Sequence, residues 1–238
     1  MDLFPAVDIR GGRVAHVRTG ATPVPSVYGD DPAAAVERLV AQGARWVHLV
    51  DLDRAYRTGS NRDVMHAVLS GATAQVQVGG ALDTEGAIDE MLSWGAARVV
   101  IGCAAAASEP TLVERLVRRH GSGCLAVGID AKDGRVAPRG GSDTSDMPAR
   151  LLARIVHGLG ARLAVYTDVT RDGTLAGPDI TGGLGIAMQG LEVVVSGGVG
   201  TLADIDTVRE ARLAGAIVGR ALHEGRFTLV EALACATA

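Results

Sequence analysis

The chain has 238 residues, of which 47% are hydrophobic and 21% are charged, and its formal net charge is −4. This length and composition suit one large domain with a sizeable hydrophobic core. The acidic balance and an aromatic content of 3% exclude a basic, base-stacking surface, so nucleic acid is not an expected partner.

Short apolar runs alternate with amphipathic stretches along the whole chain. Strands are predicted at residues 3–9, 46–52, 74–78, 98–101, 125–129, 163–167, 191–195 and 216–218. Helices are predicted at residues 32–42, 62–69, 84–94, 110–119, 146–159, 180–189, 202–212 and 228–236. The alternation predicts right-handed βαβ units around a parallel sheet, and eight units in 238 residues match the size of a (β/α)8 barrel. We therefore expect an α/β protein with a single TIM-barrel domain over residues 1–238.

An internal repeat supports closure of the barrel. The stretch that begins at Asp8 returns at Asp130, an offset of 122 residues, and both stretches end in Gly-Arg-Val-Ala. Three more landmarks recur at offsets of 117 or 118 residues: Asp51 with Asp168, Gly79-Gly80 with Gly197-Gly198, and Ile101-Gly102 with Val218-Gly219. Landmarks in the same order predict two half-barrels, roughly residues 1–121 and 122–238. An open doubly wound sheet would alternate similarly but would not be expected to repeat itself.

The repeated aspartates are candidates for acid–base catalysis. In a barrel of this kind, reactive groups lie at the carboxyl ends of strands, which places Asp8, Asp130 and Thr167 on one face. The first and fifth strands lie opposite each other, so the two aspartates would flank a central substrate as general acid and general base. A single aspartate at the end of a strand is equally consistent with capping a turn or pairing with Arg10 or Lys132. The matched pair of aspartates favours a catalytic role.

The glycine pairs predict phosphate binding, because glycine lets backbone N–H groups approach an anion closely. A lone Gly-Gly is usually a tight turn, but here each pair is followed by another glycine about 22 residues on. One expected site follows the seventh and eighth strands, and the repeat predicts another after the third and fourth. The residues of the two sites are Ser196, Gly197, Gly198, Gly219 and Arg220, and Gly79, Gly80, Gly102 and Cys103. Two sites imply a long small-molecule substrate with a phosphate at each end.

Other polar residues are less decisive. Asp172 is either catalytic or part of an Asp-Gly turn. His16 is expected in the first loop, whereas His48 lies inside a strand as a core residue or a support for the site. The histidines and the three cysteines show no metal-ligand spacing, so we expect reduced thiols and no metal. Without a leader or a long apolar run, a cytoplasmic protein is expected, with no membrane partner.

Nearly the whole chain resembles the ProFAR isomerase family of histidine biosynthesis. The resemblance rests on residues 5–8, 48–53, 59–61, 167–174, 196–199 and 216–222. The run from Asp172 to Pro178 also looks like that of the actinobacterial bifunctional relative, phosphoribosyl isomerase A, which also serves tryptophan biosynthesis. The resemblance implies a metal-free and cofactor-free Amadori rearrangement, in which Asp130 is the general acid, Asp8 the general base, and Thr167 and Asp172 assist.

The departures from the family pattern concern substrate specificity. His16 stands where the family usually has arginine, Asp83 ends a loop that normally reads Gly-Gly-Gly-Ile-Arg, and Cys103 replaces a threonine. The fifth loop reads Arg139-Gly140-Gly141 instead of Arg-Gly-Trp. Two alternatives therefore stay open: an isomerase narrowed to phosphoribosylanthranilate, and a barrel that binds phosphorylated metabolites without catalysis. We expect a monomer in each case. The related cyclase barrel fits less well, because its characteristic lysine is not evident beside Asp8.

Overall fold

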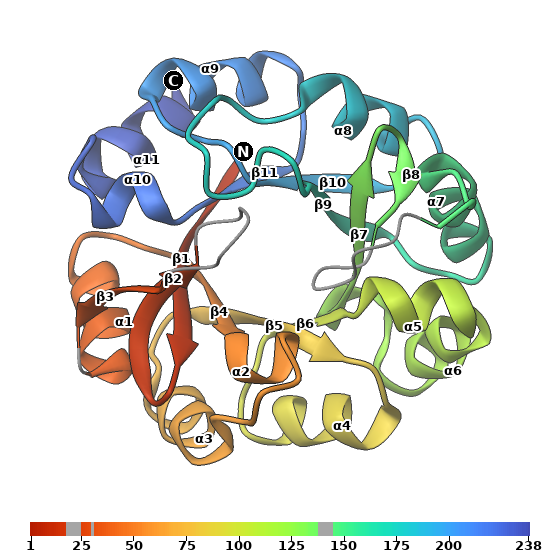
Figure 1. Ribbon diagram of the computed structural model, residues 1–238, viewed down its shortest axis with the longest axis horizontal. Coiled ribbons are helices and arrows are strands. Elements are labelled where there is room, and N and C mark those ends of the chain that lie inside the picture. The colour runs from red at the N-terminus through yellow and green to blue at the C-terminus, as the bar shows by residue number, and fades with distance from the viewer. Residues whose placement is uncertain (18–24, 30, 138–144) are drawn as a thin grey trace.

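Eight parallel strands close into a barrel in the computed structural model, which describes residues 1–17, 25–29, 31–137 and 145–238. The strands are β1 (Asp2–Arg10), β4 (Trp46–Asp51), β5 (Gln75–Leu82), β6 (Arg98–Ile101), β7 (Leu125–Lys132), β9 (Leu163–Asp168), β10 (Glu192–Ser196) and β11 (Gly215–Val218). Each strand pairs in parallel with the next, and β11 pairs with β1 to close the ring (Figure 1). The predicted TIM barrel is confirmed, whereas the division into two half-barrels stays a prediction.

The eight predicted helices form a ring around the strands (Figure 1). They are α1 (Pro32–Ala41), α3 (Arg62–Gly71), α4 (Glu85–Ser93), α6 (Thr111–His120), α7 (Ala149–Gly158), α8 (Ile180–Ala187), α9 (Leu202–Glu210) and α11 (Leu229–Thr237). Side-chain caps define several starts, since Asp31 caps α1 and Thr201 and Thr228 form capping boxes with Asp204 and Glu231. No helix in the described parts of the chain is long and apolar enough to cross a membrane.

Several short elements on the loops were not predicted. The chain after β1 folds back as β2 (Arg13–Val17) and β3 (Pro25–Gly29), and β8 (Arg135–Val136) pairs with β7. Short helices α2 (Leu52–Ala55), α5 (Cys103–Ser108) and α10 (Arg220–His223) begin directly after strands or their glycines, and a 3₁₀ turn, η1, covers Ser122–Cys124.

His16 lies in the segment between β1 and α1, as expected, but this segment is not irregular throughout. The backbone of His16 belongs to β2 and pairs with Ser26 of β3, because the first loop is long enough to form an antiparallel hairpin beside β1. The side chain of His16 lies outside the described part of the structure. Arg139 and Gly141 also fall outside the described residues, so their predicted roles in specificity stay predictions.

Strand alternation separates the barrel interior from the layer between barrel and helices. The interior cluster contains Phe4, Ala6, Trp46, Val100, Ala126, Leu163, Val165, Val194 and Ile217. The intervening residues, such as Val7 and Leu49, belong to the larger cluster that packs against the helices. Asp8 follows Ala6 by two residues and Thr167 follows Val165 by two, so alternation directs both side chains into the barrel mouth.

Candidate active site

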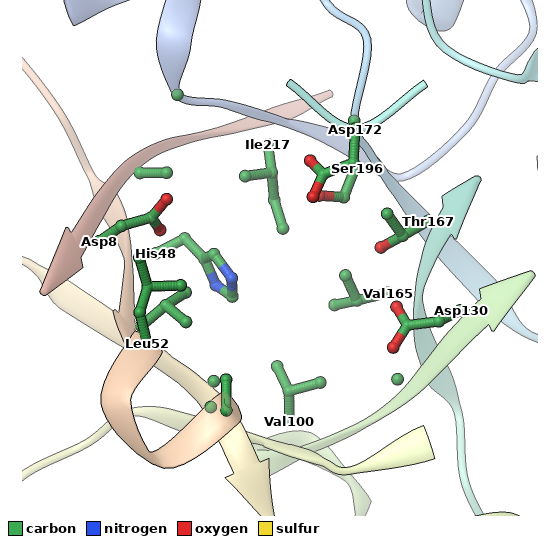
Figure 2. A pocket seen from close by; sticks show the side chains of 18 of the residues that line it. Asp8, His48, Leu52, Val100, Asp130, Val165, Thr167, Asp172, Ser196 and Ile217 are labelled. Carbon is green, nitrogen blue, oxygen red and sulfur yellow. The ribbon is translucent and has the colours of Figure 1, made fainter. Parts of the chain in front are cut away.

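A cavity of about 370 Å³ lies at the carboxyl ends of the strands, and residues from all eight barrel strands or their loops line it. Its size is in the range of small-molecule sites, and its position is the one at which TIM barrels carry their active sites. Figure 2 shows the two predicted catalytic aspartates on opposite walls, with their carboxylates directed inward. Asp8 comes from β1 and Asp130 from β7, and three strands separate β1 from β7 in either direction.

Thr167 accompanies Asp130 on its wall of the cavity. The two residues are register partners on β7 and β9, and Thr167 is only 3% exposed. Side chains at paired positions of neighbouring parallel strands point to the same face, so the hydroxyl and the carboxylate share one side of the site (Figure 2). This wall can therefore combine a proton-carrying acid with a hydroxyl that donates or accepts hydrogen bonds.

Asp172 lies in the turn after β9 and also lines the cavity. Its backbone N–H donates to the carbonyl oxygen of Asp168 (3.2 Å), which makes it part of the turn after β9. Its side chain also lines the cavity, next to Ser196 in Figure 2. The carboxylate can thus reach a ligand from a fixed turn, although its part in catalysis stays a prediction.

The predicted phosphate site of the second half is brought together at one end of the cavity. Ser196, Gly197, Gly198, Gly219 and Arg220 all line the wall there. Gly198 has a φ of +86°, and a β-carbon on it would collide with the carbonyl oxygen of Gly177, so this position requires glycine. The Arg220 guanidinium donates to the Gly173 carbonyl and to Glu224, both at 2.6 Å. These bonds hold a positive group at this end of the cavity.

The glycines of the first half line the same cavity. Gly80 has a φ of +114°, and a β-carbon on it would lie 2.6 Å from the carbonyl oxygen of Asp51. Gly79, Gly102 and Cys103 complete this wall. Burial raises the pKa of the Cys103 thiol to about 12, and the nearby Asp130 charge acts in the same direction. Cys103 is therefore a protonated thiol rather than a nucleophile.

Asp83 gives the first-half wall a negative charge. It lines the cavity, and a β-carbon on Gly102 would collide with its Oδ1 atom. This oxygen is buried and accepts no hydrogen bond from any residue in the described ranges. A buried carboxylate oxygen without a donor repels an anion and favours a hydrogen-bond donor. Asp83 thus adds a carboxylate to the first-half wall, whose loops also contribute Arg57, whereas Arg220, ion-paired with Glu224, lines the second-half wall.

A buried network ties the end of β1 to the loop after β4. Asp51 accepts from the backbone N–H of Asn61 (2.9 Å) and from its side-chain amide (2.7 Å). The same amide donates to Asp53 (2.9 Å), which also accepts from the Gly11 N–H, and Asn61 accepts from Gly12 (2.8 Å). Burial opposes ionisation of Asp53, yet the Gly11 and Asn61 hydrogen bonds dominate and lower its pKa. The network fixes the chain just beyond Asp8.

The cavity lining also contains residues that were not predicted as site residues, among them His48, Tyr56, Arg57 and Leu175. For His48 the sequence carried a signal, since strand alternation puts it on the inward face with Trp46 and Val50. Its ring points into the cavity in Figure 2. Arg57 follows the unpredicted helix α2 with a φ of +57°, and no local pattern indicated its position.

Within the described ranges, no group of three histidine, cysteine, aspartate or glutamate side chains is arranged to hold a metal ion. The polar groups at the site include the two opposed carboxylates, the Thr167 hydroxyl, the His48 imidazole and glycine-rich loops at both ends.

Comparisons with known proteins agree with this geometry. A family model described as histidine biosynthesis protein matches residues 2–228. Similar proteins include the 1-(5-phosphoribosyl)-5-((5-phosphoribosylamino)methylideneamino)imidazole-4-carboxamide isomerase of Geobacillus thermodenitrificans, 42% identical over 237 residues that cover 97% of this chain and 96% of the relative. The isomerase of the same name from Methylocella silvestris is 41% identical over 98% of this chain and 96% of its own. The isomerase of the same name from Roseiflexus is 38% identical over 98% of this chain and 99% of the relative.

Proposed function

This chain belongs to the histidine biosynthesis protein family, and we propose that it is the aldose–ketose isomerase that acts on the substrate of those relatives, ProFAR. The observation that carries the proposal is the pair of carboxylates, Asp8 and Asp130, on opposite walls of one cavity between two glycine-rich loops. Full-length similarity to isomerases of one specificity supports the same substrate.

The proposed reaction begins with opening of the ribose ring. Asp130 gives its proton to the ring oxygen as the bond from that oxygen to C1′ breaks, and the substituent nitrogen supplies the electron pair for a C=N bond. Asp8 then takes the proton from C2′, and the electrons of the C–H bond move toward the nitrogen to form an enolamine. A proton added at C1′ and one lost from the C2′ hydroxyl give the aminoketose. The product is an isomer of the substrate, so no external oxidant or reductant is consumed.

Thr167 and Asp172 are proposed to assist the two catalytic aspartates. Thr167 lies beside Asp130, where its hydroxyl can hold the carboxyl group toward the ring oxygen. Asp172 reaches the cavity from the turn after β9 and is placed to accept a hydrogen bond from a sugar hydroxyl. Both residues act by positioning reacting groups, which contributes to the rate through correct geometry.

The two ends of the cavity are proposed to bind the substrate phosphates. Backbone N–H groups at Gly198 and Gly219, with the fixed charge of Arg220, suit a phosphate at the second-half end. The first-half end offers Gly80, Gly102 and Cys103 but also carries Asp83. We expect the second-half end to bind its phosphate more tightly.

The decisive experiment is turnover of ProFAR by the purified protein and by two isosteric variants, Asp8→Asn and Asp130→Asn. Each variant should lose at least about 100-fold in kcat, because the amide cannot exchange the required proton. Asp133→Asn is the matched control, since Asp133 is an exposed acid on the turn between β7 and β8. Binding of ProFAR without turnover by the unmodified protein would instead support a barrel that only binds phosphorylated metabolites.

A second candidate substrate, phosphoribosylanthranilate, is favoured by Asp83. This compound has a phosphate at one end only and the anthranilate carboxylate at the other, so the end of the cavity that carries Asp83 would meet a singly charged carboxylate instead of a phosphate. The same Amadori chemistry would apply. The ratio of kcat/KM for the two substrates separates the candidates, and a ratio strongly in favour of phosphoribosylanthranilate would overturn ProFAR as the principal substrate.

His16, Arg139 and Gly141 remain proposed specificity residues. His16 and Gly141 replace the arginine and the tryptophan of the family pattern on the first and fifth loops, and Arg139 belongs to the same fifth-loop motif as Gly141. Restoring tryptophan at position 141 and arginine at position 83 should raise kcat/KM for ProFAR. A monomer is also proposed, and light scattering of the purified protein tests it.

A further inference from the structure

A line of polar side chains crosses the interior of the barrel below the cavity. His48 on β4 is the register partner of Gln77 on β5, and Gln77 is the register partner of Arg98 on β6. Residues paired in this way point to the same face, so the three side chains share the barrel interior. Gln77 is fully buried at 0% exposure and His48 is 9% exposed. A barrel interior is ordinarily filled by apolar side chains, so the presence of three polar side chains in it calls for an explanation.

Two hydrogen bonds connect the three side chains. Nη1 of Arg98 donates to Oε1 of Gln77 (3.3 Å), and Nε2 of Gln77 lies 3.1 Å from Nδ1 of His48. A guanidinium carries only donors, so the oxygen of the Gln77 amide must face Arg98. The amide nitrogen, which carries only hydrogens to donate, must then face His48. Nδ1 of His48 is therefore the acceptor, and the ring proton resides on Nε2.

Arg98 is itself held in place at the bottom of the barrel. Its guanidinium carbon lies 4.3 Å from the centre of the Trp46 ring and 6.0 Å from that of Phe4. Burial lowers the pKa of Arg98, while Asp2 and Glu192 oppose this shift, and an arginine stays charged in either case. Its Nε atom has no hydrogen-bond partner among the described residues. A cation kept in such a place at the cost of an unpaired donor indicates a role beyond packing.

The second half of the barrel has no counterpart of this line. At the repeat offset of 117 residues, His48, Gln77 and Arg98 correspond to Val165, Val194 and Gly215, and Val194 is the register partner of both other residues. The barrel architecture therefore accommodates apolar residues at the matching positions, so the polar line is specific to the wall that carries Asp8 and His48.

We propose that Arg98 and Gln77 are positioning residues that fix His48 as an Nε2–H donor aimed at the substrate cavity. Figure 2 shows the imidazole of His48 projecting into that cavity. β4 neighbours β1, on which Asp8 stands two residues beyond Ala6, the register partner of His48. The donor is thus placed on the wall of the proposed general base, where it hydrogen-bonds to a sugar oxygen next to the carbon that Asp8 deprotonates. This last step rests on the proposed isomerase function, whereas the fixed tautomer does not.

The tautomer can be measured directly in the intact protein. Long-range ¹H–¹⁵N spectra of protein labelled at its six histidines distinguish Nδ1–H from Nε2–H rings, and the signal absent from His48→Asn identifies His48. We expect the Nε2–H form in the unmodified protein. In Gln77→Glu, a carboxylate facing Nδ1 should reverse the ring to the Nδ1–H form. An Nδ1–H ring in the unmodified protein, or an unchanged tautomer in Gln77→Glu, would overturn the proposal.

The kinetic arm tests whether the donor matters to the reaction. Gln77→Glu should lower kcat for ProFAR by about 100–1,000-fold, the usual scale for one preorganised donor, with KM changed less than about threefold. Gln75→Glu makes the same charge change at an exposed position of the same strand and should leave kcat unchanged. Arg98→Met, which frees the Gln77 amide to rotate, should give a mixture of tautomers and an intermediate loss.

The outcomes separate the two proposals. A reversed tautomer with unchanged kcat would refute the role of His48 as a donor to the substrate. A failure of the unmodified protein to turn over ProFAR would refute the proposed function, while the spectra would still test the positioning of His48. If Gln77→Glu does not fold, the spectrum of the unmodified protein and the Arg98→Met variant keep the proposal testable.

Discussion

Replacing Asp83 by asparagine should tighten the binding of ProFAR. The substitution preserves shape and removes one negative charge from the first-half wall, where the buried Oδ1 atom lies against Gly102. A phosphate held at the backbone of Gly102 and Cys103 would lie near this oxygen, because a β-carbon on Gly102 would collide with it. Two unit charges 4 Å apart interact by about 4 kcal/mol at an effective dielectric constant of about 20 and by about 1 kcal/mol in water. Because Asp83 is partly exposed, we expect about 1–3 kcal/mol of repulsion.

This free energy corresponds to a fall in KM of about 5–150-fold, with kcat changed less than about threefold, since Asp83 has no part in the proposed proton transfers. The assay is steady-state turnover of ProFAR at two salt concentrations, and the gain should shrink as salt screens the charge. Asp133→Asn removes the same charge from the exposed β7–β8 turn and serves as the control. An unchanged KM in Asp83→Asn, or an equal fall in both variants, would refute the reasoning.

Three further predictions concern stability and reactivity. Gly80→Ala should lower the free energy of unfolding, measured in urea, by more than about 2 kcal/mol, because the new β-carbon would collide with the Asp51 carbonyl oxygen. Gly86→Ala is the control: its β-carbon would enter open space in α4, so stability should change little or rise. Equal effects of the two substitutions would contradict this reasoning. Cys103 should not react with maleimide at pH 8 until the protein unfolds, because the pKa of its thiol is raised to about 12. Mass spectrometry measures the labelling, and rapid labelling of the native protein would contradict this prediction. The folded-state pKa of Asp53 is lowered, so its stabilising contribution is present above the ordinary value of 3.8 and is lost as pH falls through the folded value. The stability gap between the unmodified protein and Asp53→Asn should therefore close below pH ~4, and a gap independent of pH would disprove the assignment.

The barrel strands and their surrounding helices could be predicted because their periodicity is local. A strand such as β6 was predicted at residues 98–101 and has those bounds, since its apolar run is buried on both faces. Helix boundaries shifted by up to three residues, as at α7, which starts at Ala149 rather than residue 146 because Pro148 before it is extended. The hairpin of β2 and β3 was missed, because its pairing depends on the folded position of β1 rather than on its own pattern.

The positions of Asp8 and Asp130 were also predictable, because the end of a barrel strand is a place defined by chain order alone. Their sequence repeat indicated a pair, and the opposed walls of Figure 2 place that pair around one cavity. The charge at position 83 was visible in the sequence as well. The sequence did not show that an oxygen of this carboxylate is buried without a hydrogen-bond donor, since this depends on the approach of Gly102 from the next unit of the barrel.

The sequence by itself determined the order of strands and helices, the ring that they form, and the face that carries the acids, because these follow from local alternation and chain order. Only the tertiary structure decided what each inward side chain meets. His48 and Gln77 are 29 residues apart in the chain, and their contact exists because β4 and β5 pair in one register. A shift of one residue would send each side chain to the opposite face of its strand, so the polar line under the cavity is a property of the closed barrel.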